Sequence, residues 1–252
     1  MSESNAAPLH PPTAAPWLAS PVLAWFFVTV WGSGYLATKV GLQYAPPFTF
    51  LVLRFAVGVL LLAPLALWWH HRGRLRWPSG GREWTHVIVA GLLMHAANLG
   101  GSHYAQYLGM SAGVTALVLS VQPLATAAIA AALLHERPRP LQWVGVLVGL
   151  AGVALVVWHK IDLREVSGAA LACVLASLAA ITVGTLYQRA FCRTADLRAA
   201  ALVQFAAAIA TLLPLAFTVE GFVFEPAWAL AGAIAFLVVF SSILAVNALH
   251  TL

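Results

Sequence analysis

The segment "LVLRFAVGVLLLAPLAL", Leu51–Leu67, is the stretch from which the fold can be predicted. It is apolar apart from Arg54, and with its flanks it reaches the roughly 20 residues that a helix needs to cross a bilayer. A related segment, "ALVQFAAAIATLLPLAF", lies at Ala201–Phe217. At a single offset Phe55 aligns with Phe205, and both segments hold the tripeptide Pro-Leu-Ala. We therefore predict an internal repeat built from membrane helices.

The same offset aligns Gly34 with Gly184 in the preceding apolar segments, so the register is shared by two successive helices. The first copy holds five predicted helices, and an odd number makes the second copy enter the membrane upside down. Inverted repeats of this kind are a signature of alternating-access transporters. We predict a disordered tail at residues 1–16, a five-helix repeat at residues 17–159 and an incomplete three-helix repeat at residues 167–252.

The composition leads independently to a membrane protein. Of the 252 residues 62% are hydrophobic and only 8% are charged, with a mean hydropathy of +0.88, whereas soluble domains carry about 25% charged residues. A window of about 19 residues finds about eight apolar segments, near residues 17–36, 48–69, 85–107, 111–134, 141–158, 168–190, 199–219 and 227–249. We predict an all-α polytopic membrane protein of the inverted five-helix-repeat type, with about eight transmembrane helices of an expected ten.

Basic residues are distributed unevenly between the two sides of this predicted bundle. With the N-terminus inside, the outside loops hold only Lys39, Lys160 and Arg164. The inside loops hold nine arginines: Arg72, Arg74, Arg76, Arg82, Arg137, Arg139, Arg189, Arg193 and Arg198. Because basic loops stay in the cytoplasm, we predict a multi-pass protein of the inner (plasma) membrane with a cytoplasmic N-terminus.

Two longer stretches carry a family resemblance. The first, "WGSGYLATKVGLQYAPPFTFLVLRFAVGVLLLAPLAL", runs from Trp31 to Leu67. The second, "GMSAGVTALVLSVQPLATAAIAAALLHERPRPLQWVGVLVGLAGVALV", runs from Gly109 to Val156. They resemble helices one and two, and helices four and five, of the EamA family in the drug/metabolite transporter (DMT) superfamily. The resemblance implies ten helices in two inverted repeats, and efflux of small metabolites across the inner membrane.

From the repeat and the resemblance together we expect a secondary transporter that exports amino acids or drugs by alternating access. We expect this chain to lack the family's last two helices, which keeps a truncated, non-transporting relative as an alternative. An intramembrane enzyme would need clustered acids, histidines or a nucleophile at membrane depth. Only His95 and His103 lie there, so we expect no enzyme.

Two groups of polar residues interrupt the apolar segments. Pro123 removes a backbone donor, which predicts a kink in the fourth segment. This step is either a packing kink or a substrate-facing site, whose face is shared by Ser111, Thr115, Gln122 and Thr126. In the third segment a polar stripe recurs at three-and-four spacing, formed by His95, Asn98, Ser102 and Gln106. We favour a cavity wall for the stripe, with interhelical hydrogen bonding as the alternative.

Arg54 either extends its charge to the outer interface or anchors a substrate carboxylate; its repeat partner is Gln204. Ser33 lies in the outer half of the first segment among aromatic residues typical of a membrane interface. The candidate substrate cavity therefore comprises Ser33, Arg54, His95, Asn98, Ser102, Gln106, Thr115, Gln122, Pro123 and Thr126.

The remaining expectations concern the loop "HERPRP" and the partners. Glu136 in this loop is a locally paired charge, and the resemblance suggests a structural role for it. The GxxxG pattern Gly145–Gly149 predicts close helix packing, and a homodimer stays open. We expect a small-molecule substrate and the lipid bilayer as partners, and no cofactor, metal or nucleic acid. Proton coupling should be either absent or carried by His95, because each Asp and Glu falls in a tail or loop.

Overall fold

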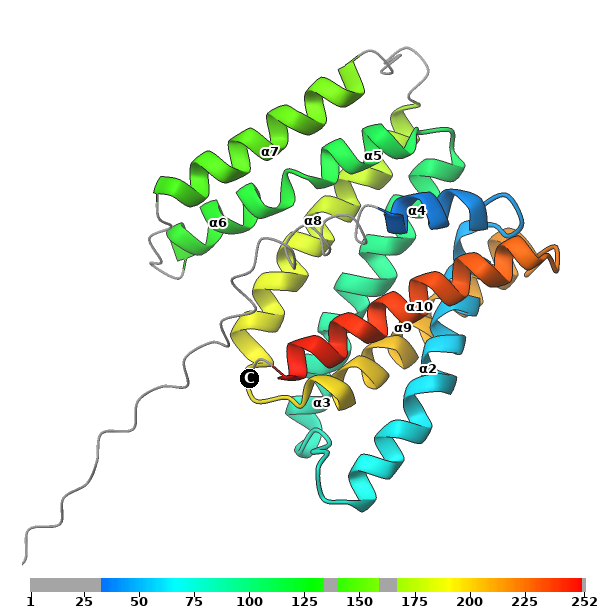
Figure 1. Cartoon of the computed structure of the whole chain (residues 1–252), viewed down its shortest axis with the longest axis vertical. Coiled ribbons are helices and arrows are strands. Elements are labelled where there is room, and N and C mark those ends of the chain that lie inside the picture. Colours follow the sequence, from blue (N-terminus) through cyan, green and yellow to red (C-terminus); the bar gives the residue numbers. More distant parts are fainter. Residues whose placement is uncertain (1–32, 134–139, 159–166, 251–252) are drawn as a thin grey trace, which may run out of the picture.

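The computed structural model describes residues 33–133, 140–158 and 167–250, and it is a bundle of helices (Figure 1). Every regular element in these ranges is helical, as the sequence predicts. The elements are a helix at residues 33–41, α2 (Pro47–His71), α3 (Gly80–Gly91), the π-helix η2 (Leu92–Ala97), α4 (Asn98–Tyr107), α5 (Ala112–Leu119), α6 (Gln122–Leu133), α7 (Pro140–Trp158), α8 (Gly168–Phe191), α9 (Leu197–Glu220) and α10 (Trp228–His250).

Four helical segments of the described ranges are long and apolar enough to span a membrane: α2, Ala112–Ile129 across α5 and α6, α8 and α9. Their outward surfaces are apolar too. Leu60 on α2 is 71% exposed and Phe217 on α9 is 57% exposed. Hydrocarbon is the solvent in which such surfaces cost nothing, so the prediction of a polytopic membrane protein is confirmed.

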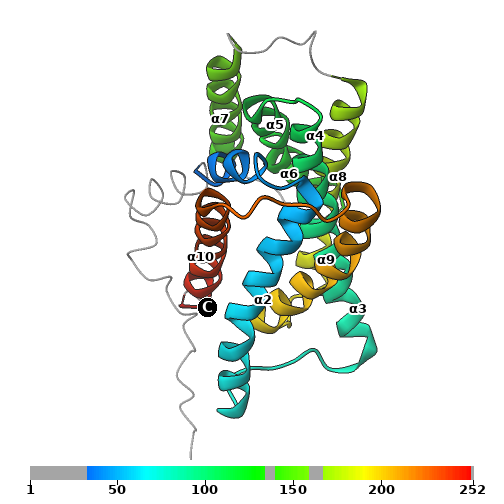
Figure 2. The same ribbon diagram turned by 90° about the vertical axis from the view of Figure 1, so that its right-hand side faces the viewer.

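The helices α2 and α9 form the centre of the bundle and run antiparallel (Figure 2). At one end Glu220 is the last residue of α9, and its carboxylate accepts hydrogen bonds from the backbone nitrogens of Phe48 at 2.9 Å and Thr49 at 2.8 Å. At the other end Asp196 caps α9 and accepts a hydrogen bond from the backbone nitrogen of Arg76 at 3.2 Å. A carboxylate therefore ties each end of the pair together.

Several contacts between the two predicted copies support the inverted repeat, which stays a prediction. The repeat-equivalent rings of Phe55 and Phe205 pack against each other with centroids 5.2 Å apart. A Cβ on Gly34 would lie 3.6 Å from Leu237 of α10, and one on its repeat partner Gly184 would lie 2.8 Å from Met94 of η2. Each copy thus packs its first helix against the third helix of the other copy.

The third predicted span is one helical run from α3 through η2 to α4, held tightly between α8 and α9. A Cβ on Gly91 would lie 2.6 Å from the Cα of Gln204, and one on Gly101 would lie 2.9 Å from the carbonyl oxygen of Cys173. Only glycine allows backbones to come this close. The π-helical turn lies between these two contacts and contains His95.

The kink predicted at Pro123 is a full interruption. Helix α5 ends at Leu119, residues Ser120 and Val121 form a turn, and α6 begins at Gln122. Proline has no N–H to bond the carbonyl of Leu119, whereas in the first turn of a new helix that donor is not needed. The Ser120 hydroxyl donates to the Leu117 carbonyl oxygen at 2.7 Å, which satisfies one of the freed acceptors.

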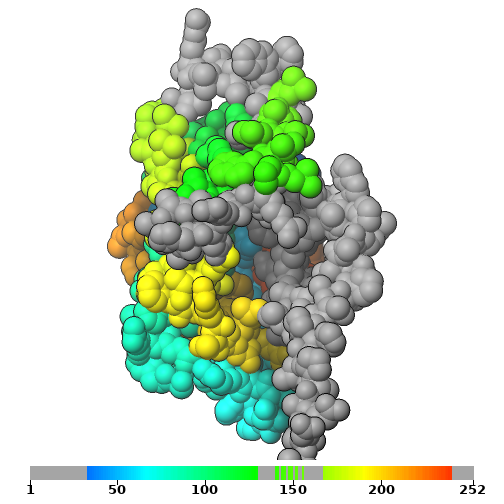
Figure 3. Space-filling view, turned by 90° about the vertical axis from the view of Figure 1, so that its left-hand side faces the viewer, coloured from blue at the N-terminus to red at the C-terminus, as the bar shows by residue number. Residues whose placement is uncertain are grey.

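Helices α5, α6 and α7 lie together along one side of the bundle (Figure 1). Figure 3 shows α7 on this face, with the end of α8 below it and the end of α2 and α3 lower still. A Cβ added at Gly145 or Gly149 of α7 would meet no atom within 4 Å. The close packing that the GxxxG pattern predicts is therefore not made within the described part of the chain.

Candidate functional site

A line of polar side chains crosses the centre of the bundle from η2 through α9 to α8. The side-chain oxygen of Gln204 on α9 lies 3.3 Å from Nε2 of His95, and its amide nitrogen donates to Oε1 of Gln188 at 3.3 Å. Gln204 is only 6% exposed. The guanidinium carbon of Arg54, the repeat partner of Gln204, lies 5.9 Å from the centroid of the Phe55 ring. We call His95, Gln204 and Gln188 the central polar line.

Two aromatic rings fix the orientation of His95 in this line. The imidazole meets Phe55 edge-on at 5.6 Å and Phe205 edge-on at 5.2 Å. Since the Gln204 oxygen is an acceptor, Nε2 of His95 is the donor and Nδ1 is left without the proton in the neutral ring. The histidine therefore packs against α9 through a hydrogen bond, which is the alternative raised for the polar stripe.

The other three residues of the stripe have different partners. The Ser177 hydroxyl of α8 contacts the Asn98 carbonyl oxygen at 2.7 Å and its Oδ1 at 2.9 Å, and both residues are buried. Ser102 and Gln106 bond backbone carbonyls of their own helix. The stripe thus divides between α9, α8 and its own backbone, and a shared cavity wall stays a prediction.

The interrupted helix α5–α6 also has a polar contact with α8. Nε2 of Gln122 lies 3.2 Å from the Thr126 hydroxyl and 3.5 Å from the Thr185 hydroxyl. Thr115 is buried and bonds the Ser111 carbonyl oxygen, one turn earlier. Pro123 itself is exposed. The side chain of Gln122 therefore faces α8, whereas the hydroxyl of Thr115 bonds the backbone of its own helix.

Two of the residues named from the sequence remain, Ser33 and Glu136. Ser33 is partly buried in the short helix at residues 33–41. Glu136 lies outside the described residues. Among the residues that the structure describes, no group of three or more His, Cys, Asp and Glu side chains is arranged to hold a metal ion.

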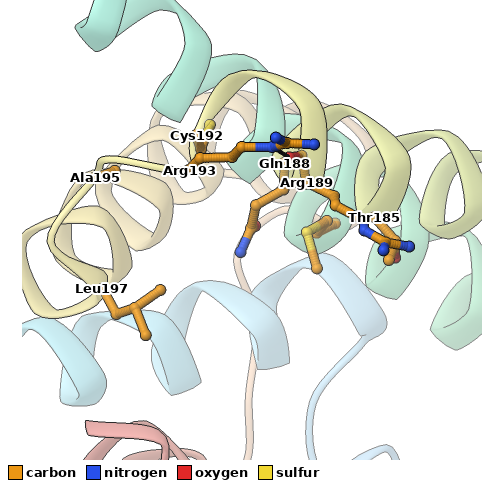
Figure 4. A pocket seen from close by; sticks show the side chains of 8 residues that line it. Thr185, Gln188, Arg189, Cys192, Arg193, Ala195 and Leu197 are labelled. Atoms are coloured by element: carbon orange, nitrogen blue, oxygen red, sulfur yellow. Dashed lines mark hydrogen bonds between the residues drawn. The ribbon is translucent and has the colours of Figure 1, made fainter. Parts of the chain in front are cut away.

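An open pocket of about 350 Å³ lies at the end of α8, and we call it the α8 pocket (Figure 4). Its wall combines two arginines with polar and apolar side chains: Met94, Thr185, Gln188, Arg189, Cys192, Arg193, Ala195 and Leu197. Gln188 belongs to the central polar line and Thr185 contacts Gln122. The α8 pocket is thus where the two polar features of the bundle meet.

This pocket was not predicted from the sequence. Arg189 and Arg193 entered only the prediction of orientation, because they lie at the end of an apolar segment. A signal was present, since Thr185, Gln188 and Cys192 recur at three-and-four spacing and so share one helix face. What the spacing does not show is that Met94 and Leu197 complete the wall from other segments.

Comparisons with known proteins agree with this architecture. Residues 19–158 match the EamA-like transporter family. The chain is 28% identical over 222 residues to the "Uncharacterized inner membrane transporter YedA" of Escherichia coli strain K12, covering 87% of this chain and 69% of that protein.

Two further relatives match shorter stretches. The chain is 26% identical over 167 residues to a "Probable amino-acid metabolite efflux pump" of Salmonella typhimurium strain LT2, covering 66% of this chain and 52% of the relative. It is 29% identical over 134 residues to the "Uncharacterized transporter YvbV" of Bacillus subtilis strain 168, covering 52% of this chain and 41% of the relative. Because the family match spans more than half of the 252 residues, the chain belongs to the EamA-like transporter family of membrane proteins.

Proposed function

We propose that the protein is a secondary transporter that exports small metabolites, such as amino acids or drugs, across the inner membrane by alternating access. The observation that carries this proposal is the central polar line, which leads from His95 in the bundle to the open α8 pocket. Polar side chains at membrane depth are costly, and they commonly mark substrate pathways. The printed names of the relatives, which include transporters and an efflux pump, support the same function.

The orientation of the pocket follows from the predicted topology. The α8 pocket lies beside the start of α9, at the end of the bundle where Asp196 binds Arg76. That end carries the arginine-rich loops, so we assign it to the cytoplasm. We infer that the α8 pocket is the entrance from which a substrate is taken up for export.

At the opposite end of the bundle, described residues of α2, α4 and α9 pack against one another. The rings of Phe48 and Tyr104 stack with centroids 5.3 Å apart, next to the contact of Glu220 with Phe48 and Thr49. We therefore assign the structure to an inward-open state. The backbone interruptions at η2 and at Ser120–Val121 are the places where helices can bend at low cost.

Proteoliposomes test the proposal directly. The purified full chain is reconstituted, and the movement of labelled amino acids and drugs is compared with protein-free liposomes. We expect faster movement of at least one solute, and a several-fold lower rate in Gln204→Met, because methionine keeps the volume of Gln204 but breaks both amide contacts. Thr211→Val is the control, since Thr211 is exposed on the same helix and bonds only its own backbone. Rates equal to those of empty liposomes across the panel would refute the function.

A further inference from the structure

We propose that the C-terminal end of α2 binds the headgroup of an anionic phospholipid through Arg72 and Arg74, with Trp68 beside the acyl chains of that lipid. We call Trp68, Arg72 and Arg74 the headgroup surface, and all three residues are exposed. The inference goes beyond the proposed function and does not depend on it, because it concerns the lipid around the bundle rather than a transported solute.

The length of α2 places this surface at headgroup depth. The 25 residues from Pro47 to His71 extend about 37 Å at roughly 1.5 Å per residue, whereas the hydrocarbon core of a bilayer is about 30 Å thick. The two ends of α2 therefore reach the polar regions of the bilayer. Trp68 lies in the last turn of α2 and is 47% exposed, which is typical of the tryptophans that mark a membrane interface.

Backbone hydrogen bonds hold the two arginines at the end of the helix. The backbone nitrogen of Arg72 donates to the Trp68 carbonyl oxygen at 3.2 Å. The backbone nitrogen of Arg74 donates to the Trp69 carbonyl oxygen at 2.8 Å. Gly73 between them has a φ of +64°, the left-handed conformation with which many helices end. The two arginines thus belong to a hydrogen-bonded turn on α2, which lowers the entropy lost when a ligand binds them.

Side-chain contacts distinguish Arg72 from Arg76, the next arginine after the turn. The guanidinium carbon of Arg72 lies 4.5 Å from the centroid of the Trp68 ring, and this cation–π contact keeps the charge beside an exposed ring. Arg76 instead forms an ion pair with Glu83 at 3.2 Å. We therefore leave Arg76 out of the headgroup surface, because its charge is already balanced by Glu83.

A phospholipid fits the headgroup surface in both charge and depth. Phosphate oxygens accept paired hydrogen bonds from a guanidinium group. Basic residues directly beside a membrane helix attract anionic lipids, each by roughly a fivefold factor in affinity. Phosphatidylcholine carries the same phosphate, but its trimethylammonium group is repelled by guanidinium charge. The predicted orientation puts the C-terminal end of α2 at the cytoplasmic leaflet, where anionic lipids attract such segments.

The competing explanation is that Arg72 and Arg74 only orient the chain during insertion and interact favourably with the C-terminal end of α2. On that explanation the folded protein has no preference between lipids. The full chain is purified in a neutral detergent and titrated with phosphatidylglycerol or phosphatidylcholine of identical acyl chains, and native mass spectrometry measures the bound lipid. We expect the first phosphatidylglycerol to bind about tenfold more tightly than the first phosphatidylcholine.

Four variants locate the binding site. R72Q and R74Q should each lower the affinity for phosphatidylglycerol by roughly fivefold. R72Q/R74Q should abolish the preference for it. W68L keeps an apolar side chain but loses the cation–π contact with Arg72, so we expect a several-fold loss. Circular dichroism checks that each variant is folded, and the single variants decide the test if the double variant does not fold.

R82Q is the matched control. It removes another exposed arginine from the same predicted side, at the start of α3. Figure 2 shows α3 across the connecting segment from the end of α2. We expect an unchanged affinity for phosphatidylglycerol in R82Q, whereas an effect of net charge alone would lower it as much as R72Q does.

Three results would overturn the inference: equal affinity for the two lipids, a preference unchanged in R72Q and R74Q, or an equal loss in R82Q. Glycerophosphoglycerol, which has the headgroup of phosphatidylglycerol but no acyl chains, is added as a soluble competitor. We expect it not to displace the lipid at equal concentration. Displacement would assign the arginines to a soluble phosphate and refute the lipid site. Since no solute movement is measured, these outcomes are independent of the transport proposal.

Discussion

At the scale of single residues, His95 is held by contacts from two other helices. It lies in a π-helical turn between two phenylalanine rings and bonds Gln204 on another helix. A π-helical turn in a long helix often marks a functional position. The same contacts also describe a well-packed structural residue, so a functional measurement must separate the two roles.

We predict that His95→Gln shows no solute accumulation driven by a pH gradient. The described Asp and Glu side chains lie at helix ends or in loops, which leaves His95 and His103 at membrane depth. Of these two, His95 contacts a side chain of another helix and His103 contacts its neighbour Ser102. Glutamine keeps a donor for Gln204, so the fold should survive. The measurement compares liposomes with and without an imposed gradient, for the native chain and the variant. Gradient-driven accumulation that is undiminished in the variant would exclude the histidine.

A second residue-scale prediction concerns Gly91. Its substitution by alanine places a Cβ about 2.6 Å from the Gln204 Cα, which forces α3 and α9 apart. We expect a loss of about 1–3 kcal/mol in the free energy of unfolding, as for other overpacked sites. Gly145→Ala is the matched control, because nothing lies within 4 Å of its added Cβ. The two variants are compared by unfolding in detergent; equal stability would show that the contact can relax freely.

At the scale of elements, the antiparallel pair α2–α9 depends on its two end contacts. The first backbone donors of α2 have no partner within their own helix, and the Glu220 carboxylate takes two of them together with the Thr49 hydroxyl. A negative charge at a helix N-terminus also interacts favourably with the helix dipole. One side chain of α9 thus completes the start of α2.

We predict that Glu220→Gln lowers the free energy of unfolding by about 1–2 kcal/mol, since hydrogen bonds to charged groups contribute more than neutral ones. Glu225→Gln removes the same charge five residues later, at an exposed position, and should change stability much less. Denaturation of both variants in detergent, followed by circular dichroism, measures the difference. A loss of equal size in both would assign the effect to net charge rather than to the helix start.

At the scale of the whole molecule, the contacts place the two ends of α9 at opposite ends of the bundle. Its start lies beside Arg76, just after α2, and its end lies beside Phe48 at the start of α2. The orientation predicted from the positive-inside distribution would put the start of α9 in the cytoplasm.

We predict that a cysteine at His71 is labelled from the cytoplasmic side and one at Val223 from the outer side. Both positions are exposed in loops or helix ends. Cys173 and Cys192 are replaced by serine first, and an impermeant maleimide is applied to right-side-out and inside-out vesicles. Labelling of both cysteines from the same side would refute the helix count between them, and exchanged sides would refute the orientation.

The membrane helices and the family could be determined from the sequence because hydropathy is a local property. The predicted segments 48–69, 168–190 and 199–219 lie within two residues of the ends of α2, α8 and α9. Pro123 correctly predicted where the helix of the fourth segment is disturbed. Whether the helix bends or stops there depends on how α5 and α6 pack against their neighbours.

The partners of the polar residues were decided only by the tertiary structure. His95 and Asn98 belong to one stripe in the sequence, yet they bond different helices. The run that holds them contains a π-helical turn, and its glycines let Gln204 and Cys173 come close from two sides. Met94 and Leu197 come from other segments and complete the wall of the α8 pocket, whose other side is a face of α8. Distances of this kind are set by side-chain volume across the whole bundle, and no window of the sequence contains them.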